Sequence, residues 1–258
     1  MKPICCLLVL YCAATPFLTV ETQASLADGL LAHYELNGNA QDSSGNGLHG
    51  TLGNVSFASD RFGVANKAAS FNGTPTSYIS INTHALDLAP AFTVSAWIKF
   101  PTEAGIDGPR IFSTAGYELT LNEHSVGRLA AMNYTLPAPL DAPTVESSSP
   151  VPSDSWIQIV GVWAANRMSL YINGSLSASL TTPVAPDYSR GWTPTIGVNS
   201  GAYSQSDYSG LIDDVRIYGR SLSDGEVQQL FQVESVPEPS VLVLAFTGLA
   251  FVLARRRN

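Results

Sequence analysis

The chain has 258 residues, of which 21 are acidic and 13 are basic, giving a net charge of −8. This length suffices for one large domain or two small ones with a buried core. An acidic surface of this kind argues against nucleic acid as a partner and is compatible with divalent cations.

The first 24 residues have the pattern of a secretory signal peptide. Lys2 supplies the basic start, and Ile4–Ala14 forms the apolar run. The small residues that end at Ala24 provide a cleavage site. All three cysteines, at positions 5, 6 and 12, fall in this segment. We therefore expect a mature protein that begins at Ser25 and has no disulfide bond. Up to Ser235 it carries nine basic and 19 acidic residues, a net charge of about −10.

A strand and a turn-rich loop open the predicted domain. Residues 29–37 alternate between apolar and polar positions, as a half-buried strand does. The loop 42–47, DSSGNG, consists of turn-forming residues, and its oxygen-bearing side chains at Asp42 and Asn46 also suit one half of a calcium loop. An EF-hand would end in glutamate, where this chain has Gly53. A simple turn and a contribution to a cation site both remain open.

Several further strands follow along the chain. Residues 92–100, FTVSAWIKF, form the clearest two-faced strand, with Trp97 on its polar side either as a platform for sugar stacking or as a structural tryptophan under a covering loop. Residues 156–163 predict a strand buried on both faces, and Asn173-Gly174 predicts a tight hairpin. Shorter strands are expected at 68–72, 78–81, 111–113, 117–121, 127–134 and 195–198, and a long loop at 136–154.

The stretch GLIDDVRIYGR, residues 210–220, contains the strand on which the domain depends. Strict alternation over 211–218 predicts that Asp213 and Asp214 point to opposite faces. A carboxylate inside a sheet needs a partner, which can be Arg216, a backbone donor or a bound cation. For Asp214 we expect the partner to be Arg216 or solvent.

A short helix closes the domain. Ser223 and Glu226 form a capping box, and Leu222 with Val227 forms a hydrophobic staple. Many short strands, frequent turns and one short helix near the C-terminal side predict an all-β sandwich.

The segments AHYELNGNAQDSSGNGLHG, FTVSAWIK, WIQIVGVW, LYINGSL and GLIDDVRIYGRSLSDGEVQQLF occur in an order that resembles laminin-G-like, concanavalin A-like domains. The resemblance covers about Gly29 to Gln232 and is weaker between Thr102 and Ser155. It implies a two-sheet antiparallel jelly roll over residues 25–235.

The resemblance also implies a structural calcium ion in many relatives. Asp213 matches the aspartate of the pattern D-x-V-R-x-Y, and Asp42 or Asn46 would assist it. Removal of calcium would then lower the melting temperature of the wild type but not of Asp213→Ala. The alternative for Asp213 is an acid that is hydrogen-bonded within the strand.

The last segment, residues 236–258, resembles a PEP-CTERM sorting signal. Pro237-Glu238-Pro239 is followed by an uncharged run, Ser240–Ala254, and by three arginines at Arg255, Arg256 and Arg257. The run predicts a separate hydrophobic helix that enters the membrane before processing, with the arginines on the cytoplasmic side. The resemblance implies processing by an exosortase in the envelope of a Gram-negative bacterium.

These features predict an exported surface or biofilm-matrix protein that binds glycans or proteins without catalysis. The alternatives are a divergent glycoside hydrolase and a passive matrix component. The paired acids of such hydrolases are missing, since Glu118 and Glu123 are separated by Thr120 and Asn122 on the alternating positions. The ligand-binding residues are not specified by the sequence; the aromatic candidates are Tyr117, Trp192 and Tyr203.

Overall fold

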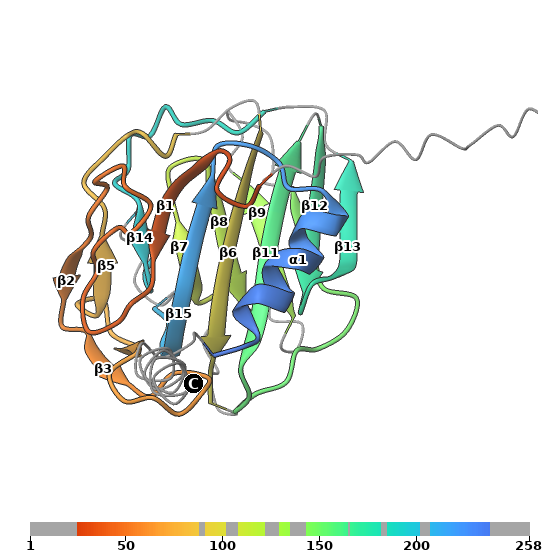
Figure 1. Ribbon diagram of the computed structural model, residues 1–258. Coiled ribbons are helices and arrows are strands. Elements are labelled where there is room, and N and C mark those ends of the chain that lie inside the picture. The colour runs from red at the N-terminus through yellow and green to blue at the C-terminus, as the bar shows by residue number, and fades with distance from the viewer. Residues whose placement is uncertain are drawn as a thin grey trace, which may run out of the picture.

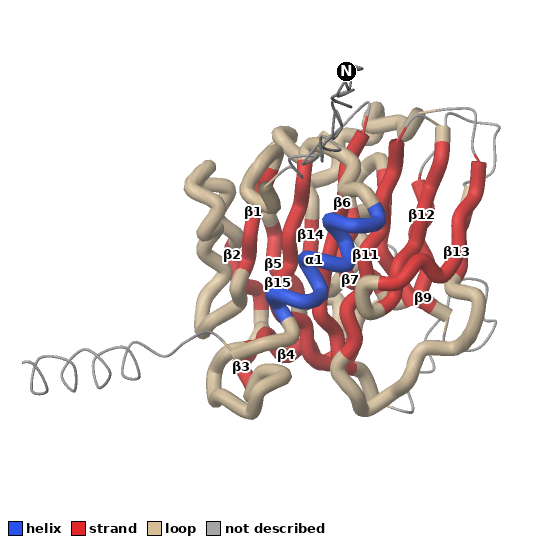
Figure 2. The backbone as a smooth tube through the Cα atoms, turned by 45° about the vertical axis from the view of Figure 1, so that its right-hand side comes forward, coloured by secondary structure: helices blue, strands red, loops and turns tan. Residues whose placement is uncertain are grey.

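The computed structural model describes residues 25–87, 91–101, 108–121, 129–134, 143–164, 166–181, 185–201 and 207–237. The predicted signal peptide and nearly all of the sorting segment lie outside these residues. Two antiparallel sheets pack face to face, and the helix α1 (Asp224–Glu234) lies on the outer face of one of them, as Figures 1 and 2 show. The prediction of a two-sheet jelly-roll sandwich with one short helix is confirmed.

The sheet under the helix, which we call sheet A, has its longest strands at the centre. Its strand order is β13-β12-β11-β6-β15-β4-β3. The first half of β15 pairs with β4, and its second half pairs with β1. Its strands in the described residues are β1 (Leu30–Tyr34), β3 (Ser56–Ala58), β4 (Ala68–Asn72), β6 (Ala91–Lys99), β11 (Ile157–Ala164), β12 (Arg167–Ile172), β13 (Ser175–Thr181) and β15 (Ser209–Tyr218).

The second sheet, sheet B, has the order β10-β9-β8-β7-β14-β5-β2. Its strand β10 falls inside the stretch for which the sequence predicted only a loop. The bounds of its strands in the described residues are β2 (Thr51–Gly53), β5 (Tyr78–Ser80), β7 (Arg110–Ser113), β8 (Tyr117–Leu121), β9 (Ala130–Tyr134), β10 (Thr144–Glu146) and β14 (Thr195–Ile196).

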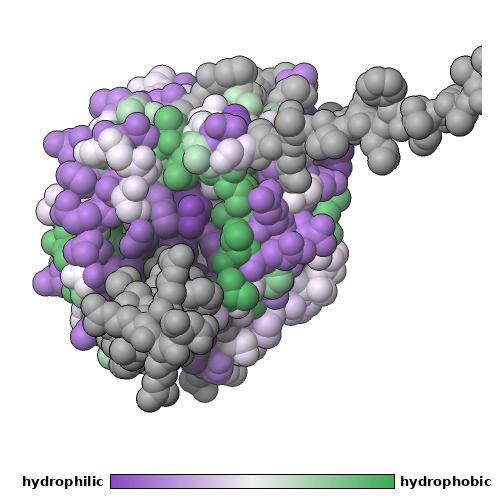
Figure 3. All heavy atoms as spheres, in the orientation of Figure 1, coloured by the Kyte–Doolittle hydropathy of each residue, from purple (hydrophilic) through white to green (hydrophobic). Residues whose placement is uncertain are grey.

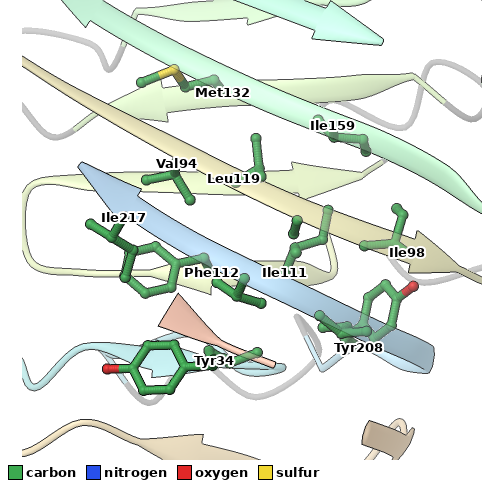
Figure 4. Packing of buried hydrophobic residues seen from close by; sticks show 14 of the residues in the cluster. Tyr34, Val94, Ile98, Ile111, Phe112, Leu119, Met132, Ile159, Tyr208 and Ile217 are labelled. Carbon is green, nitrogen blue, oxygen red and sulfur yellow. The ribbon is translucent and has the colours of Figure 1, made fainter. Parts of the chain in front are cut away.

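The main core fills the space between the sheets. Both sheets contribute alternate side chains to one continuous cluster, as expected when each strand buries every second residue. Figure 4 shows part of this cluster and labels Tyr34, Val94, Ile98, Ile111, Phe112, Leu119, Met132, Ile159, Tyr208 and Ile217.

A second, smaller core lies between sheet A and α1. It is formed by Val160, Tyr171 and Tyr218 from the sheet with Val227 and Leu230 from the helix. The capping box is present, since Ser223 accepts from the backbone N–H of Glu226 and the Glu226 side chain accepts from that of Ser223. Because α1 covers this face, β6 and β11 are buried on both sides.

Local turn chemistry also follows the sequence. Asn173 and Gly174 both have positive φ angles, 49° and 74°, in the hairpin between β12 and β13. Two consecutive left-handed residues are what a two-residue hairpin with the twist of its strands requires.

Candidate functional site

A β-bulge in β15 brings two carboxylates to the same side of sheet A. Asp213 lies opposite Trp97 of β6 and Arg216 lies opposite Ser95, so that Asp214 and Val215 together face one residue. Asp214 has a φ of 45°, the left-handed conformation that aspartate tolerates better than most residues. The extra residue resets the alternation, and Val215 enters the core. The prediction that the two aspartates face opposite sides is therefore wrong.

Arg61, from the segment between β3 and β4, binds both carboxylates. Its Nη1 lies 2.6 Å from Asp213 Oδ2 and its Nη2 lies 2.5 Å from Asp214 Oδ2. The other oxygen of Asp214 lies 2.9 Å from His33 Nε2. The Arg61 side chain is only 9% exposed, so these ion pairs are largely shielded from water. Arg61 and His33 replace the Arg216 that the sequence suggested for Asp214.

The same guanidinium fixes the end of α1. Arg61 Nε donates to the carbonyl of Glu234 over 2.8 Å, and the Glu234 carboxylate accepts from Arg216 Nε at 2.5 Å. Its second oxygen accepts from Trp97 Nε1 at 2.7 Å and from Gln158 Nε2 at 2.8 Å. We call these residues and the aspartate pair the Arg61 cluster. It joins β15, β6 and β11 to the last turn of the helix.

The environment within the Arg61 cluster shifts the pKa values of its two aspartates in opposite directions. Burial, together with the neighbouring charge of Asp214, raises the pKa of Asp213 to about 8, against the opposing pull of Arg61. Burial also acts to raise the pKa of Asp214, but the hydrogen bond from His33 and the charge of Arg61 outweigh it and leave that pKa below its usual value. Two adjacent acids that share one cation thus have different proton affinities.

An open cavity of about 530 Å³ lies beside this cluster. Arg61, Asp213, Asp214 and Arg216 line it together with residues at the end of α1. In the space-filling view, hydrophilic surface on this side of the molecule adjoins a strip of hydrophobic surface (Figure 3).

A second polar network lies on sheet B around Glu118 of β8. Arg110 Nε is 2.8 Å from Glu118 Oε2, while Ser113 Oγ donates to Oε1 at 2.9 Å and Asn199 Nδ2 donates to it at 3.2 Å. Asn133 of β9 is the direct cross-strand neighbour of Glu118. Carboxylate, guanidinium, amide and hydroxyl groups are thus gathered on adjacent strands of one sheet.

An aromatic ring borders this network. The Trp192 ring packs on Gly201, where a Cβ atom would lie 2.5 Å from the ring, so the close approach depends on glycine. The N–H of Gly201 donates to Asn199 Oδ1 over 2.7 Å, which connects the ring to the partners of Glu118. Arg190, an exposed residue, places its guanidinium 4.8 Å from the centre of the ring. We call Trp192 and the Glu118 network the sheet B site.

Comparison with known families identifies both parts of the chain. The model of the concanavalin A-like lectin/glucanases superfamily (Laminin_G_3) matches residues 72–228, more than half of the sequence. The chain belongs to this superfamily. The PEP-CTERM protein-sorting motif matches residues 235–257, which marks the superfamily domain as one that is sorted to the cell surface. No curated protein matches the sequence.

Solved structures share the fold. The binding domain of Paraclostridial Mosquitocidal Protein 1 is similar with a TM-score of 0.64 and 20% identity over 80% of this chain and 52% of that one. The Botulinum Neurotoxin Type G receptor binding domain gives 0.61 and 18% over 80% and 51%. Domain 4 of AbnA, a GH43 extracellular arabinanase from Geobacillus stearothermophilus solved in complex with arabinotriose, gives 0.59 and 24% over 78% and 97%. The chain thus spans about half the length of the first two of these structures.

The loop at 42–47, which the resemblance to this superfamily linked to calcium, is held by protein groups. Asp42 Oδ1 accepts from the backbone N–H groups of His33 and Ser44, and Oδ2 accepts from that of Leu48, all within 3.0 Å. Asn46 Nδ2 donates to the carbonyls of Leu30 and Leu31.

In this structure Asp213 Oδ2 faces Arg61, and the Asp42 carboxylate caps the loop. Within the described ranges, no group of three or more His, Cys, Asp or Glu residues is placed to hold a metal ion. The structural calcium stays a prediction.

The structure places the aromatic candidates in different environments. Tyr117 is a core residue, 1% exposed, and its ring centroid is 3.9 Å from that of Phe92. Trp97 is structural, buried under α1 and stacked on Phe231, so the sugar-platform interpretation does not apply to it. Trp192 belongs to the sheet B site. Tyr203 lies outside the described residues.

The sorting residues are described only at their start. Pro237 follows the helix and lines the cavity, while Glu238, Pro239 and the three terminal arginines lie outside the described residues. In the part of the chain that is described, α1 is too short and too polar to cross a membrane.

Proposed function

We propose that this protein is exported, is processed by an exosortase at its PEP-CTERM segment, and acts at the cell surface or in the extracellular matrix as a glycan-binding domain without catalysis. The family match over 72–228 and the sorting motif over 235–257 support the export route and the lectin-like scaffold. The predicted signal peptide is consistent with the same route.

The observation that carries the glycan proposal is the sheet B site. A tryptophan ring offers an apolar face that packs against the C–H groups of a sugar ring. Glu118, Asn133 and Arg110 supply carboxylate, amide and guanidinium groups of the kind that orient sugar hydroxyls, although Glu118 and Asn133 are only 8% and 7% exposed. Ring and polar groups are connected through Gly201 and Asn199.

A binding role is favoured over hydrolysis by the partners of Glu118. Retaining and inverting glycosidases use two carboxyl groups on either side of the scissile bond. The described partners of Glu118 are a guanidinium, a hydroxyl and an amide. Both oxygens accept from these groups, so among the described residues the carboxylate of Glu118 is held by donors and faces no second carboxylate.

The test is binding of the secreted protein to a panel of polysaccharides and oligosaccharides. Trp192→Ala should weaken binding about tenfold or more, since aromatic anchors dominate such sites. Leu176→Ala, an exposed apolar residue of β13 on sheet A, serves as the matched control and should bind like the wild type. Equal binding by Trp192→Ala, or a panel without any binding, would overturn the proposal. Release of oligosaccharides that stops in Glu118→Gln would instead assign an enzyme.

A further inference from the structure

The cavity beside the Arg61 cluster has an apolar rim. Val64, Val233 and Val236 line it and are 50%, 53% and 60% exposed. The half-buried Phe62 also lines it. Three of the most exposed large apolar side chains in the described part of the chain therefore lie around one opening. Such a concentration of apolar surface is typical of a contact region for another molecule.

The cavity wall carries more acidic than basic side chains. Glu35, Asp60, Asp213, Asp214 and Glu234 line it, against Arg61, Lys67 and Arg216. Arg61 and Arg216 are already bound to the acids of the Arg61 cluster. Among the described contacts, the carboxylate of Glu35 accepts only from the side chain of Asn37, and Glu35 lines the cavity. A partner that presents a basic group next to an apolar side chain would complement this wall.

The sorting motif begins in the wall of the same cavity. The Arg61 cluster holds Glu234 at the end of α1, and the next residues, Val236 and Pro237, line the opening. A chain advances by at most about 3.6 Å per residue, so Pro239 lies within roughly 8 Å of Pro237. An enzyme that reads Pro237-Glu238-Pro239 must therefore come within about 8 Å of the cavity rim.

We propose that this cavity and its rim are a docking surface for the membrane-bound sorting enzyme, which inserts an apolar side chain flanked by a basic group. Recognition then has two parts, the linear motif and the folded surface from which the motif emerges. This inference rests on the proposed sorting of the protein and adds a folded determinant to it. The Arg61 cluster has the role of fixing the distance between the two parts.

The test uses the full-length chain in cells that express the sorting enzyme. The rate of conversion to the processed form is measured by mass spectrometry. The double substitution Val64→Ser/Val233→Ser should lower this rate about tenfold. The matched control is Leu52→Ser/Leu176→Ser, which changes two exposed leucines on β2 and β13 and should leave the rate unchanged. Equal melting temperatures of the two purified double variants would exclude a folding defect.

Two further variants test the charge and the spacing. Glu35→Lys should slow processing, because it places a positive charge where the partner's basic group binds, and Lys67→Glu should not slow it. An insertion of about eight Gly and Ser residues between Ser235 and Val236 separates the motif from the rim. With the insertion present, Val64→Ser/Val233→Ser should have no additional effect, as expected for one shared contact.

The outcomes separate docking from sorting. If Glu238→Ala/Pro239→Ala blocks conversion while the rim variants are processed at the wild-type rate, the enzyme reads the linear motif alone and the docking surface is refuted. If conversion persists in Glu238→Ala/Pro239→Ala, the proposed sorting itself is wrong.

Discussion

Arg61 binds two adjacent acidic side chains from a position far away in the sequence. Each acid alone would be a buried charge without a partner, which costs several kcal/mol. The arrangement works because the bulge turns Asp214 to the side of Asp213, and because a guanidinium can donate to two acceptors from separate nitrogens. The guanidinium also lies 4.8 Å from the ring centre of Trp97, so its flat face packs on an aromatic surface.

The raised pKa of Asp213 predicts how stability depends on pH. Its pKa is about 8 in the folded protein and about 3.9 in the unfolded chain, so between these values the folded state holds a proton that the unfolded state has lost. The unfolding free energy therefore falls as the pH rises from 4 to 8. Urea unfolding between pH 5 and 8 should show a loss of at least about 1 kcal/mol from this group.

Asp213→Asn should remove most of this pH dependence. Asp187→Asn is the control, because the Asp187 pKa is lowered by hydrogen bonds from Ser189 and this acid titrates only at more acidic pH. An unchanged slope in Asp213→Asn would mean that Asp213 is ionised throughout this range.

At the scale of elements, the short helix α1 has two structural roles. It seals the outer face of β6 and β11, and it fixes the start of the sorting segment through Glu234. Eleven residues are too few for an isolated helix to be stable in water, so its stability comes from the cap and from packing on sheet A.

Loss of the cap should therefore be measurable. Ser223→Ala removes the acceptor for the Glu226 N–H and should lower the unfolding free energy by about 1 kcal/mol. Ser223→Thr keeps a hydroxyl at the same place and should restore most of the loss. Chemical denaturation of the three proteins measures both effects; a threonine variant as unstable as the alanine variant would contradict the capping role.

Elements defined by local patterns were predictable, and those defined by distant contacts were not. The capping box and Asn173-Gly174 act within a few residues, so the sequence contains their full signal. The bulge at Asp214 depends on pairing with β6, and Arg61 reaches the aspartates across 152 residues of sequence. The same holds for Trp97: its polar face was evident, but the helix that covers it comes from the other end of the domain.

The candidate sites were likewise predictable only where local sequence defines them. The acidic pair in β15 was expected to need a partner, yet nothing around Arg61 in the sequence identifies it as that partner. Trp192 was one aromatic among several, and its contacts with Gly201 and Arg190 distinguish it in the structure. The strand β10 was missed because three residues between proline- and serine-rich stretches show too little periodicity.

At the scale of the whole molecule, the two predicted ends and the domain between them describe one exported protein. The three cysteines lie in the predicted signal peptide, so a secreted form that begins at Ser25 contains none. Mass spectrometry of the secreted protein should find this N-terminus. A reducing agent should change its melting temperature by less than about 1 °C, because no disulfide restrains the unfolded chain. Retention of residues 1–24, or a clear fall in the melting temperature, would contradict this prediction.

The position of β15 has a consequence for the order of events during secretion. This strand is the last of the fold in sequence but lies in the interior of sheet A, between β6 on one side and β4 and β1 on the other. A polypeptide that leaves the cytoplasm from its amino end therefore presents open strand edges on all three neighbours until the segment 209–218 has emerged. Completion of the sandwich must wait for almost the entire polypeptide, and only the helix separates that moment from the arrival of the sorting signal. A molecule translocated in this way would expose those strand edges to aggregation and proteolysis until that step.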